Sequence, residues 1–240
     1  TAGAATASLQ IRNWTRDDWL AALAYAHVAA AGALLARIGG VMPALGGMAA
    51  AALAGGGKRL FAGRLAGGAA FALLLLGGWA VAVLLAANQP LAEQLGHSLF
   101  DGQLYFSGVA QLALVAPWSL FAAVAFVLLS RHLLLARVYP DYFTARRLRA
   151  WPVVLGFDLL AALTLALATM TMGVMGGFAL VFVPAWIAFR RARSWRKGML
   201  LAVVIGVAGY GAAFLLALGL DQPFGPVLAL LLIAVGLIIA

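Results

Sequence analysis

The chain has 240 residues, of which 65% are hydrophobic and 10% are charged, whereas soluble domains are about half apolar and about one quarter charged. So few polar residues cannot cover the surface of a soluble domain, and the composition therefore predicts an integral membrane protein. The formal net charge of +9 does not indicate nucleic-acid binding, because cytoplasmic loops of membrane proteins are enriched in Lys and Arg. The absence of cysteine excludes disulfides, thiolate metal sites and thiol catalysis.

Apolar segments in the first half of the chain predict four membrane spans. They are expected at about residues 19–38, 41–54, 65–87 and 108–130. A loop with Lys58, Arg59 and Arg64 separates the second span from the third. Residues 1–11 are mostly small and apolar and do not begin with Met, so they are compatible with the tail of a truncated further span.

Four more spans are predicted in the second half of the chain. They are expected at about residues 152–171, 173–189, 199–220 and 227–240. The first two of these are joined almost directly, and Asp221, Gln222 and Pro223 form the turn between the last two. The expected fold is therefore all-α, a polytopic transmembrane bundle of about eight spans, or nine with a truncated N-terminal span. Residues 1–240 would form a single transmembrane domain.

The charges predict how the spans are oriented. If the basic loops are cytoplasmic, the spans alternate without conflict, and fifteen of the sixteen Lys and Arg residues lie inside, with Arg37 the exception. The outer loops carry Glu93, Asp101 and Asp221 instead. This partition follows the positive-inside rule, and it predicts a multi-pass membrane protein with a cytoplasmic C-terminus.

The outer segment 88–107 is polar and lacks Lys and Arg. Glu93, His97 and Asp101 are spaced four residues apart, which places them on one face of a helix. Two interpretations are open for this outer acidic loop. One is a solvated amphipathic surface helix, which is the commoner arrangement, and the other is a patch that collects metal ions.

Two ionisable residues are expected inside the membrane, where such side chains are costly and often functional. His27 lies near the middle of the first span, and it is either hydrogen-bonded to a neighbouring helix or involved in metal or proton transfer. Asp158 lies about two turns into the fifth span. It is either an interfacial carboxylate that reaches toward Arg149 or part of a cation pathway.

The sequence contains no catalytic signature. It lacks a glycine-rich phosphate loop, an HExxH motif and a nucleophile elbow. We therefore expect a transport protein and not an enzyme, with no cofactor bound by this chain and with any energy supplied by another subunit. Pro117 and Pro184 lie within spans, which is common in transporters.

Five short segments, taken in chain order, carry a family resemblance. They are His27 with Gly32, Leu99-Phe100-Asp101-Gly102-Gln103 with Ser107, Tyr139-Pro140-Asp141, Gly173-Val174-Met175 with Val183-Pro184-Ala185 and Ala188, and Asp221-Gln222-Pro223-Phe224-Gly225-Pro226. The interval of eleven residues between the glycine and the proline of the fourth segment is kept. Together these segments resemble the permease subunits of zinc, manganese and iron ABC importers, from about residue 11 to the end.

The resemblance implies a homodimeric permease of the bacterial inner (plasma) membrane. It would transport a divalent metal ion (Zn, Mn or Fe) by alternating access. Its partners would be an ATP-binding cassette subunit on the cytoplasmic side and an extracytoplasmic solute-binding protein. The cytoplasmic segment 131–151 would contain the coupling helix, and the ATPase-coupling residues would be Tyr139, Pro140, Asp141, Arg146 and Arg147. The metal itself would be a transported substrate, with His27 and Asp158 as the candidate ligands.

One departure from the family pattern concerns the pathway itself. The family has an Asp one turn before the histidine, where the two side chains can hold a divalent cation together, but this chain has Leu23. Asp158 is the one intramembrane carboxylate that could compensate. The departure also favours an alternative function, a permease-like structural or assembly subunit of a larger membrane complex without metal transport.

Overall fold

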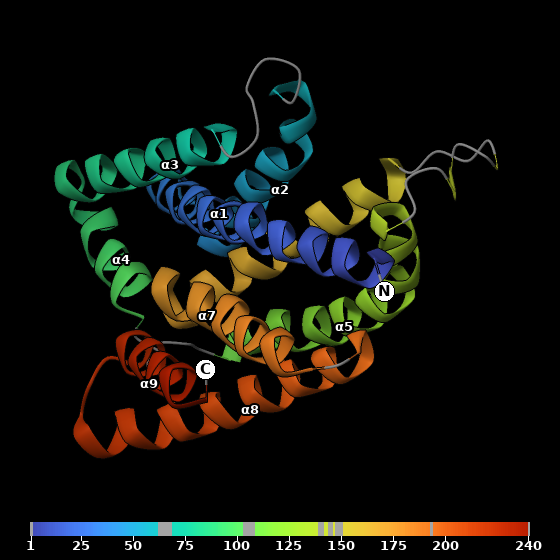
Figure 1. The fold of residues 1–240 in the computed structure, drawn as a ribbon. Helices are drawn as coiled ribbons and strands as arrows, with labels where there is room; N and C mark the ends of the chain where they lie inside the picture. The colour runs from blue at the N-terminus through green and yellow to red at the C-terminus, as the bar shows by residue number, and fades with distance from the viewer. Residues whose placement is uncertain are drawn as a thin grey trace.

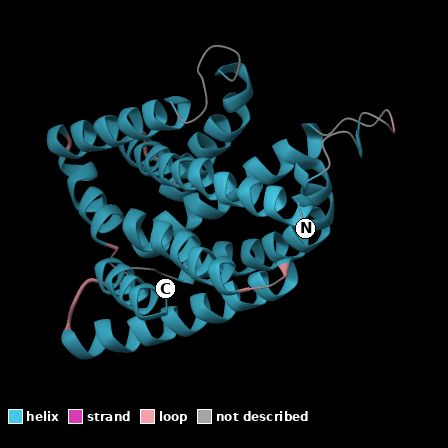
Figure 2. Ribbon diagram, viewed as in Figure 1, coloured by secondary structure: helices cyan, strands magenta, loops and turns pink. Residues whose placement is uncertain are grey.

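The computed structural model describes residues 2–61, 69–102, 109–138, 142–143, 146, 151–192 and 194–239, and the described residues form helices and turns without strands (Figure 2). The helices in these ranges include α1 (Ala2–Ile38), α2 (Pro43–Phe61), α3 (Ala69–Asn88), α4 (Pro90–Asp101), α5 (Val109–Val138), α7 (Trp151–Arg191), α8 (Trp195–Leu220) and α9 (Phe224–Ile239) (Figure 1). The all-α bundle expected from the sequence is confirmed.

Helix α1 lies at the centre of the bundle, in contact with α2, α3, α4 and α7 (Figure 1). Its C-terminal half is rich in alanine, and almost every residue from 20 to 34 is buried. The helix is longer than the predicted first span, because it begins at Ala2 and continues without a break through residues 12–18, four of which are charged. No Gly or Pro stands between residues 4 and 31 to interrupt it.

Small residues allow the neighbours of α1 to approach its backbone closely. A side chain at Gly32 would collide with the backbone of Gly46 in α2, and a side chain at Gly46 would collide with Gly32 in return. Helix α3 also comes close to α1, because a Cβ built on Gly78 would lie 2.8 Å from the Val28 nitrogen. Such contacts are typical of packing between transmembrane helices.

Helix α7 is a hairpin of two spans joined at Gly173. This glycine has φ 78° and ψ 167°, a conformation that is essentially restricted to glycine. Beyond it the chain folds back, since a Cβ on Gly177 would lie 3.2 Å from the Cβ of Ala168. Phe178 also packs against the cluster that contains Ala162 and Leu165. The fifth and sixth predicted spans are therefore confirmed, with a single glycine as their connection.

Helices α3, α5 and α8 present apolar side chains outward. Leu120, Val127, Leu200, Val207 and Leu215 are all more than 60% exposed, which suits a surface that faces hydrocarbon and not water. Among the described residues, four helical segments are long and apolar enough to span a membrane, and the shorter apolar helices 115–130 and 224–238 join them. Trp118 of α5 donates a hydrogen bond to Thr164 of α7 at 3.2 Å.

Candidate metal pathway

His27 lies on the enclosed part of α1 and is 5% exposed. Its Nδ1 lies 2.8 Å from the carbonyl oxygen of Leu23, one turn earlier. A carbonyl can only accept a hydrogen bond, so Nδ1 carries the proton and donates it. The other ring nitrogen, Nε2, then keeps its lone pair. A histidine whose first nitrogen is fixed in this way is suited to bind a metal ion through the second.

The described residues that contact His27 or lie one turn from it are apolar. Its ring lies 6.3 Å from that of Phe100 in α4, tilted by 50°, and the backbone of α3 crosses at Gly78. Leu23 is partly buried beside it. In the part of the chain that the structure describes, no group of three His, Cys, Asp or Glu residues is close enough to hold a metal ion.

Asp158 is also buried, at 8% exposed, but it belongs to a different part of the bundle. Its carbonyl lies 3.3 Å from the position of a Cβ on Gly55, so this turn of α7 packs against α2. The α1 residues that face α2 include Ala29 and Gly32, which point about 200° and 140° away from His27 around a helix of 3.6 residues per turn. His27 therefore points away from the side of α1 that α2 covers, whereas the turn that carries Asp158 packs against α2. The structure does not bring them together in one site.

The outer segment forms the amphipathic helix α4. Ala92, Gly96 and Leu99 face the bundle, while Glu93 and His97 are exposed. The segment is therefore an amphipathic helix with its described polar residues on the exposed face, and a role in collecting metal ions stays a prediction. The side chain of Asp101, the third member of the predicted acidic face, lies outside the described side chains.

Three of the segments that carry the family resemblance meet at the outer end of the bundle. Gly102 ends α4 with φ 69°, and the Gly225 nitrogen donates to the Gly102 oxygen at 3.3 Å. A Cβ built on Gly173 would lie 2.6 Å from the Gly102 Cα. We call these three residues the outer glycine junction. Sequence reasoning recorded each motif but did not predict the junction, since nothing in one sequence indicates which distant glycines touch.

Sequence reasoning also missed the side chain of Thr169. It is fully buried in α7, and its hydroxyl has no hydrogen-bond partner among the described residues. No signal marked it, because threonine is common in transmembrane helices and usually bonds to the carbonyl four residues earlier, as Thr164 and Thr171 do here.

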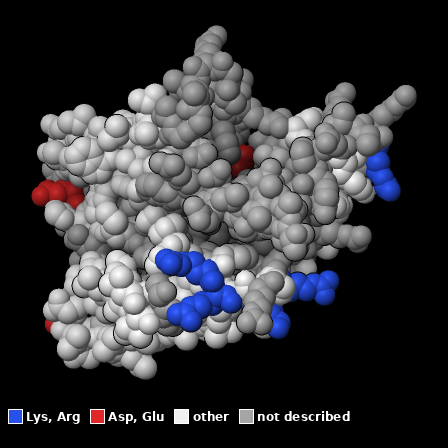
Figure 3. Space-filling model, viewed as in Figure 1, with Lys and Arg blue, Asp and Glu red and all other residues white. Residues whose placement is uncertain are grey.

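The opposite end of the bundle is basic. Of the predicted coupling residues, Tyr139, Pro140, Asp141 and Arg147 lie outside the described residues. Arg146 is exposed, and its guanidinium lies 5.0 Å from the centre of the Tyr142 ring. Phe143 beside it is buried. The other described cations of this end are Arg190, Arg191, Arg196 and Lys197, all exposed around the turn between α7 and α8 (Figure 3).

Comparison with known proteins identifies the family. The profile of the ABC 3 transport family matches residues 9–240, and no curated protein sequence matches the chain significantly. The fold is similar to that of PsaBC from Streptococcus pneumoniae in complex with Fab, with a TM-score of 0.79 at 18% identity over 93% of this chain and 81% of that chain. At this identity the second comparison supports the fold alone. The family match covers nearly the whole chain and agrees with the resemblance to permeases of metal-ion ABC importers, so the chain belongs to the ABC 3 transport family.

Proposed function

We propose that this chain is the membrane-spanning permease subunit of an ATP-driven importer for a divalent metal ion, Zn, Mn or Fe. It would act as a homodimer, with a separate ATP-binding cassette subunit at its basic end and a solute-binding protein that delivers the ion to its outer end. Family membership over residues 9–240 supports the permease role. The ion, the partners and the cytoplasmic placement of the C-terminus belong to the proposal.

The observation that supports a metal ion as the substrate is the burial and hydrogen bonding of His27. It lies in the central helix, buried, with Nδ1 committed to the Leu23 carbonyl and Nε2 available as a ligand. Zn, Mn and Fe all accept imidazole ligands. A single neutral imidazole does not neutralise a divalent ion. The pathway would therefore need further oxygen ligands, such as water, a carbonyl or a group from the second permease copy.

The test is metal uptake by vesicles that contain the complete importer, with radioactive or fluorescent detection of Zn and Mn. We expect the His27→Ala variant to lose uptake on the order of tenfold or more, because an inner-sphere ligand matters at least as much as the outer-sphere groups whose loss costs about 10–100-fold. His132→Ala is the matched control. His132 also bonds through Nδ1 to the carbonyl four residues earlier, at 3.4 Å, but it is exposed.

The same preparation tests the partner. The permease should co-purify with an ATP-binding subunit, and uptake should require ATP. Equal metal uptake by the wild-type protein and the His27→Ala variant would remove His27 from the pathway. Isolation of the intact complex without any nucleotide-binding subunit would contradict the importer itself.

A second candidate function is a permease-like structural or assembly subunit that does not transport metal. Two observations favour it: Leu23 stands at the position of the expected carboxylate, and Asp158 lies in a turn of α7 that packs against α2, whereas His27 points away from the side of α1 that faces α2. This candidate predicts no ATP-dependent uptake of Zn, Mn or Fe by the purified wild-type complex, and stable association with other membrane subunits.

A further inference from the structure

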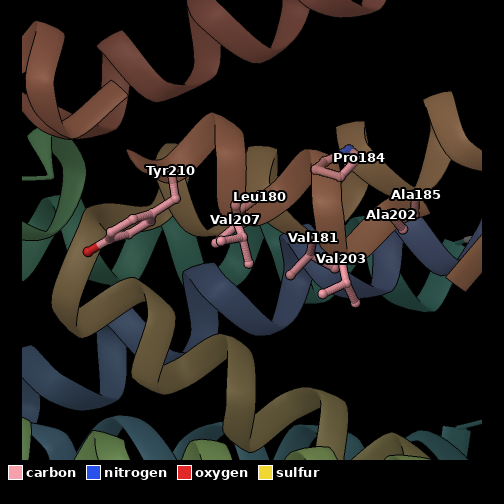
Figure 4. A pocket seen from close by; sticks show the side chains of 9 residues that line it. Leu180, Val181, Pro184, Ala185, Ala202, Val203, Val207 and Tyr210 are labelled. Carbon is pink, nitrogen blue, oxygen red and sulfur yellow. The ribbon is translucent and has the colours of Figure 1, made fainter. Parts of the chain in front are cut away.

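An apolar groove runs along the surface between the second half of α7 and the first half of α8. It has a volume of about 490 Å³ and is lined by residues within 180–185 of α7 and 202–210 of α8 (Figure 4). Figure 4 shows the lining side chains in a row, from Tyr210 at one end to Ala185 and Ala202 at the other. All of them are apolar except Tyr210, whose ring packs edge-on against Phe224 at 5.0 Å.

The floor of the groove is open because α8 has a glycine there. A Cβ on Gly206 would lie 3.8 Å from the nearest atoms of Leu180 and Pro184, which is ordinary contact distance. The position therefore leaves free the volume that a larger side chain would occupy. An apolar groove on a helix surface within the membrane offers water few hydrogen-bond partners. Its occupant is therefore apolar, an acyl chain or apolar side chains.

Two cations stand beyond the basic end of this groove. Arg191 follows Pro184 by seven residues, and Arg196 precedes Val203 by seven residues. Seven residues are close to two helical turns, so each arginine lies on the same face as a groove-lining residue, about 10 Å further along its helix. Both side chains are exposed, and neither forms an ion pair with a described residue. Figure 3 shows Lys and Arg side chains gathered over this turn.

Arg190 differs from these two cations although it belongs to the same turn. Its guanidinium lies 5.1 Å from the centre of the Trp186 ring, and Trp186 in turn packs against Gly236 of α9. Arg190 is thus held toward α9, away from the groove. This difference provides a charge-matched control within a single helical turn.

We propose that the groove between α7 and α8 binds an anionic phospholipid from the leaflet on the basic side of the membrane. One acyl chain would lie along the groove, and the phosphate would be held by Arg191 and Arg196. The arrangement fits this occupant because the apolar part, about 12 Å long from residue 202 to residue 210, and the paired cations follow one another in the order of a lipid's tail and headgroup. A transmembrane helix from a second copy would use the apolar groove but would leave the two cations unexplained. An acidic surface of the ATP-binding subunit would use the cations but would leave the groove unexplained.

The test is a titration of the purified protein with phosphatidylglycerol and with phosphatidylethanolamine, read by native mass spectrometry. Wild-type protein should bind the anionic lipid more tightly than the zwitterionic one. The variants R191Q and R196Q should each weaken phosphatidylglycerol binding on the order of fivefold, the effect expected for one cation near an anionic headgroup. R190Q should change it less than twofold.

A second pair of variants tests the groove without changing charge. Gly206→Leu should fill the groove and weaken the binding of both lipids. Gly211→Leu, on the same helix with no atom within 4 Å of its Cβ position, should leave the binding unchanged. Melting temperature and elution volume of each variant report that the fold is kept.

Three results would overturn the proposal. The first is equal affinity of the wild-type protein for the two lipids. The second is conversion of a dimer to a monomer by Gly206→Leu with lipid binding unchanged, which would assign the groove to a second copy. The third is loss of the ATP-binding subunit from R191Q and R196Q with phosphatidylglycerol binding unchanged. None of these readouts depends on metal transport, so the lipid site and the importer function stand or fall separately.

Discussion

The imidazole of His27 is oriented by a backbone atom, the carbonyl oxygen of Leu23, and not by a side chain. The side chain at position 23 is therefore free to change without disturbing the bond that fixes the histidine tautomer. Leu23 is one turn from His27 on the same helix face and is partly buried. The position where the family resemblance leads us to expect an Asp is thus still geometrically suited to a carboxylate, although this chain has an apolar residue there.

The variant Leu23→Asp should restore a two-ligand site. A carboxylate beside the Nε2 lone pair of His27 supplies negative charge that a lone imidazole lacks, and we expect the affinity of the purified protein for Mn or Zn to rise on the order of tenfold or more. The measurement is competition against a fluorescent chelator.

Two controls separate charge and position in this experiment. Leu23→Asn has a similar shape without the charge, and Leu35→Asp places a carboxylate at an exposed position of α1. Neither should raise the affinity. An unchanged affinity of Leu23→Asp, with His27 intact and the protein folded, would mean that Nε2 does not face a space that an ion can enter.

The site residues differ in how far the sequence could predict them. His27 was identifiable because a polar side chain in an apolar span is conspicuous on its own. The failure of Asp158 to approach it was not predictable, because it depends on which face of α1 each neighbouring helix covers, and that is decided by the contacts at Gly32, Gly46 and Gly55. The outer glycine junction was out of reach for the same reason.

At the scale of secondary-structure elements, the α7 hairpin is the feature on which the outer end of the bundle depends. Two apolar spans reverse direction at one residue, and the bend is possible because Gly173 adopts φ 78° and ψ 167°. The same residue touches Gly102 at the end of α4. The backbone oxygen of Gly102 in turn accepts a hydrogen bond from Gly225 at the start of α9. The three elements therefore meet through their backbones, with no side chain between them.

Gly173→Ala should destabilise the protein strongly, although it adds only one methyl group. The new methyl group would meet the Gly102 Cα at 2.6 Å, and the backbone conformation alone costs an ordinary residue about 1–3 kcal/mol. We expect the melting temperature in detergent to fall by roughly 4 °C or more, on the scale of about 2–4 °C per kcal/mol for a chain of this length.

Gly156→Ala is the control for this substitution, because Gly156 lies in the same helix with helical geometry and no atom within 4 Å of its Cβ position. It should be neutral or slightly stabilising, since alanine is the better helix former. Equal melting temperatures for Gly173→Ala and Gly156→Ala would show that the hairpin does not depend on this glycine.

Most elements could be predicted from the sequence, because an apolar run of about 20 residues bounded by charges specifies a span almost by itself. The two spans of α7 were separated correctly at Gly173. The length of α1 was not predicted, since the charged residues 12–18 suggested a boundary, but Arg, Asp and Trp are all compatible with a continuing helix. A charge ends an apolar run without ending the helix.

For the whole molecule, the main physical feature is the separation of charge between its two ends. In Figure 3 carboxylates lie on the side where α4 and the α8–α9 turn are found, with one more acidic group near the middle of the view. Lys and Arg lie over the lower middle of the view and on the opposite side. Exposed Glu93 and Asp221 belong to the first end, and the cations of the α7–α8 turn belong to the second. The positive-inside rule predicts that the second end is cytoplasmic. A cation that arrives from outside would then meet the acidic end first.

This orientation can be tested without background because the chain contains no cysteine. We expect Gln94→Cys, exposed on α4, to react with a membrane-impermeant maleimide in intact cells, and Lys197→Cys, exposed near the start of α8, to react only after the membrane is opened. The cysteine-free parent is the blank, and labelling of both variants in detergent shows that each thiol is accessible in the folded protein.

The reverse labelling pattern would place the cation-rich end outside, and the ATP-binding subunit could then not dock where the charges suggest. The reverse pattern would also contradict a cytoplasmic C-terminus. Helix α8 leads away from the end that carries Lys197, and α9 leads back to it.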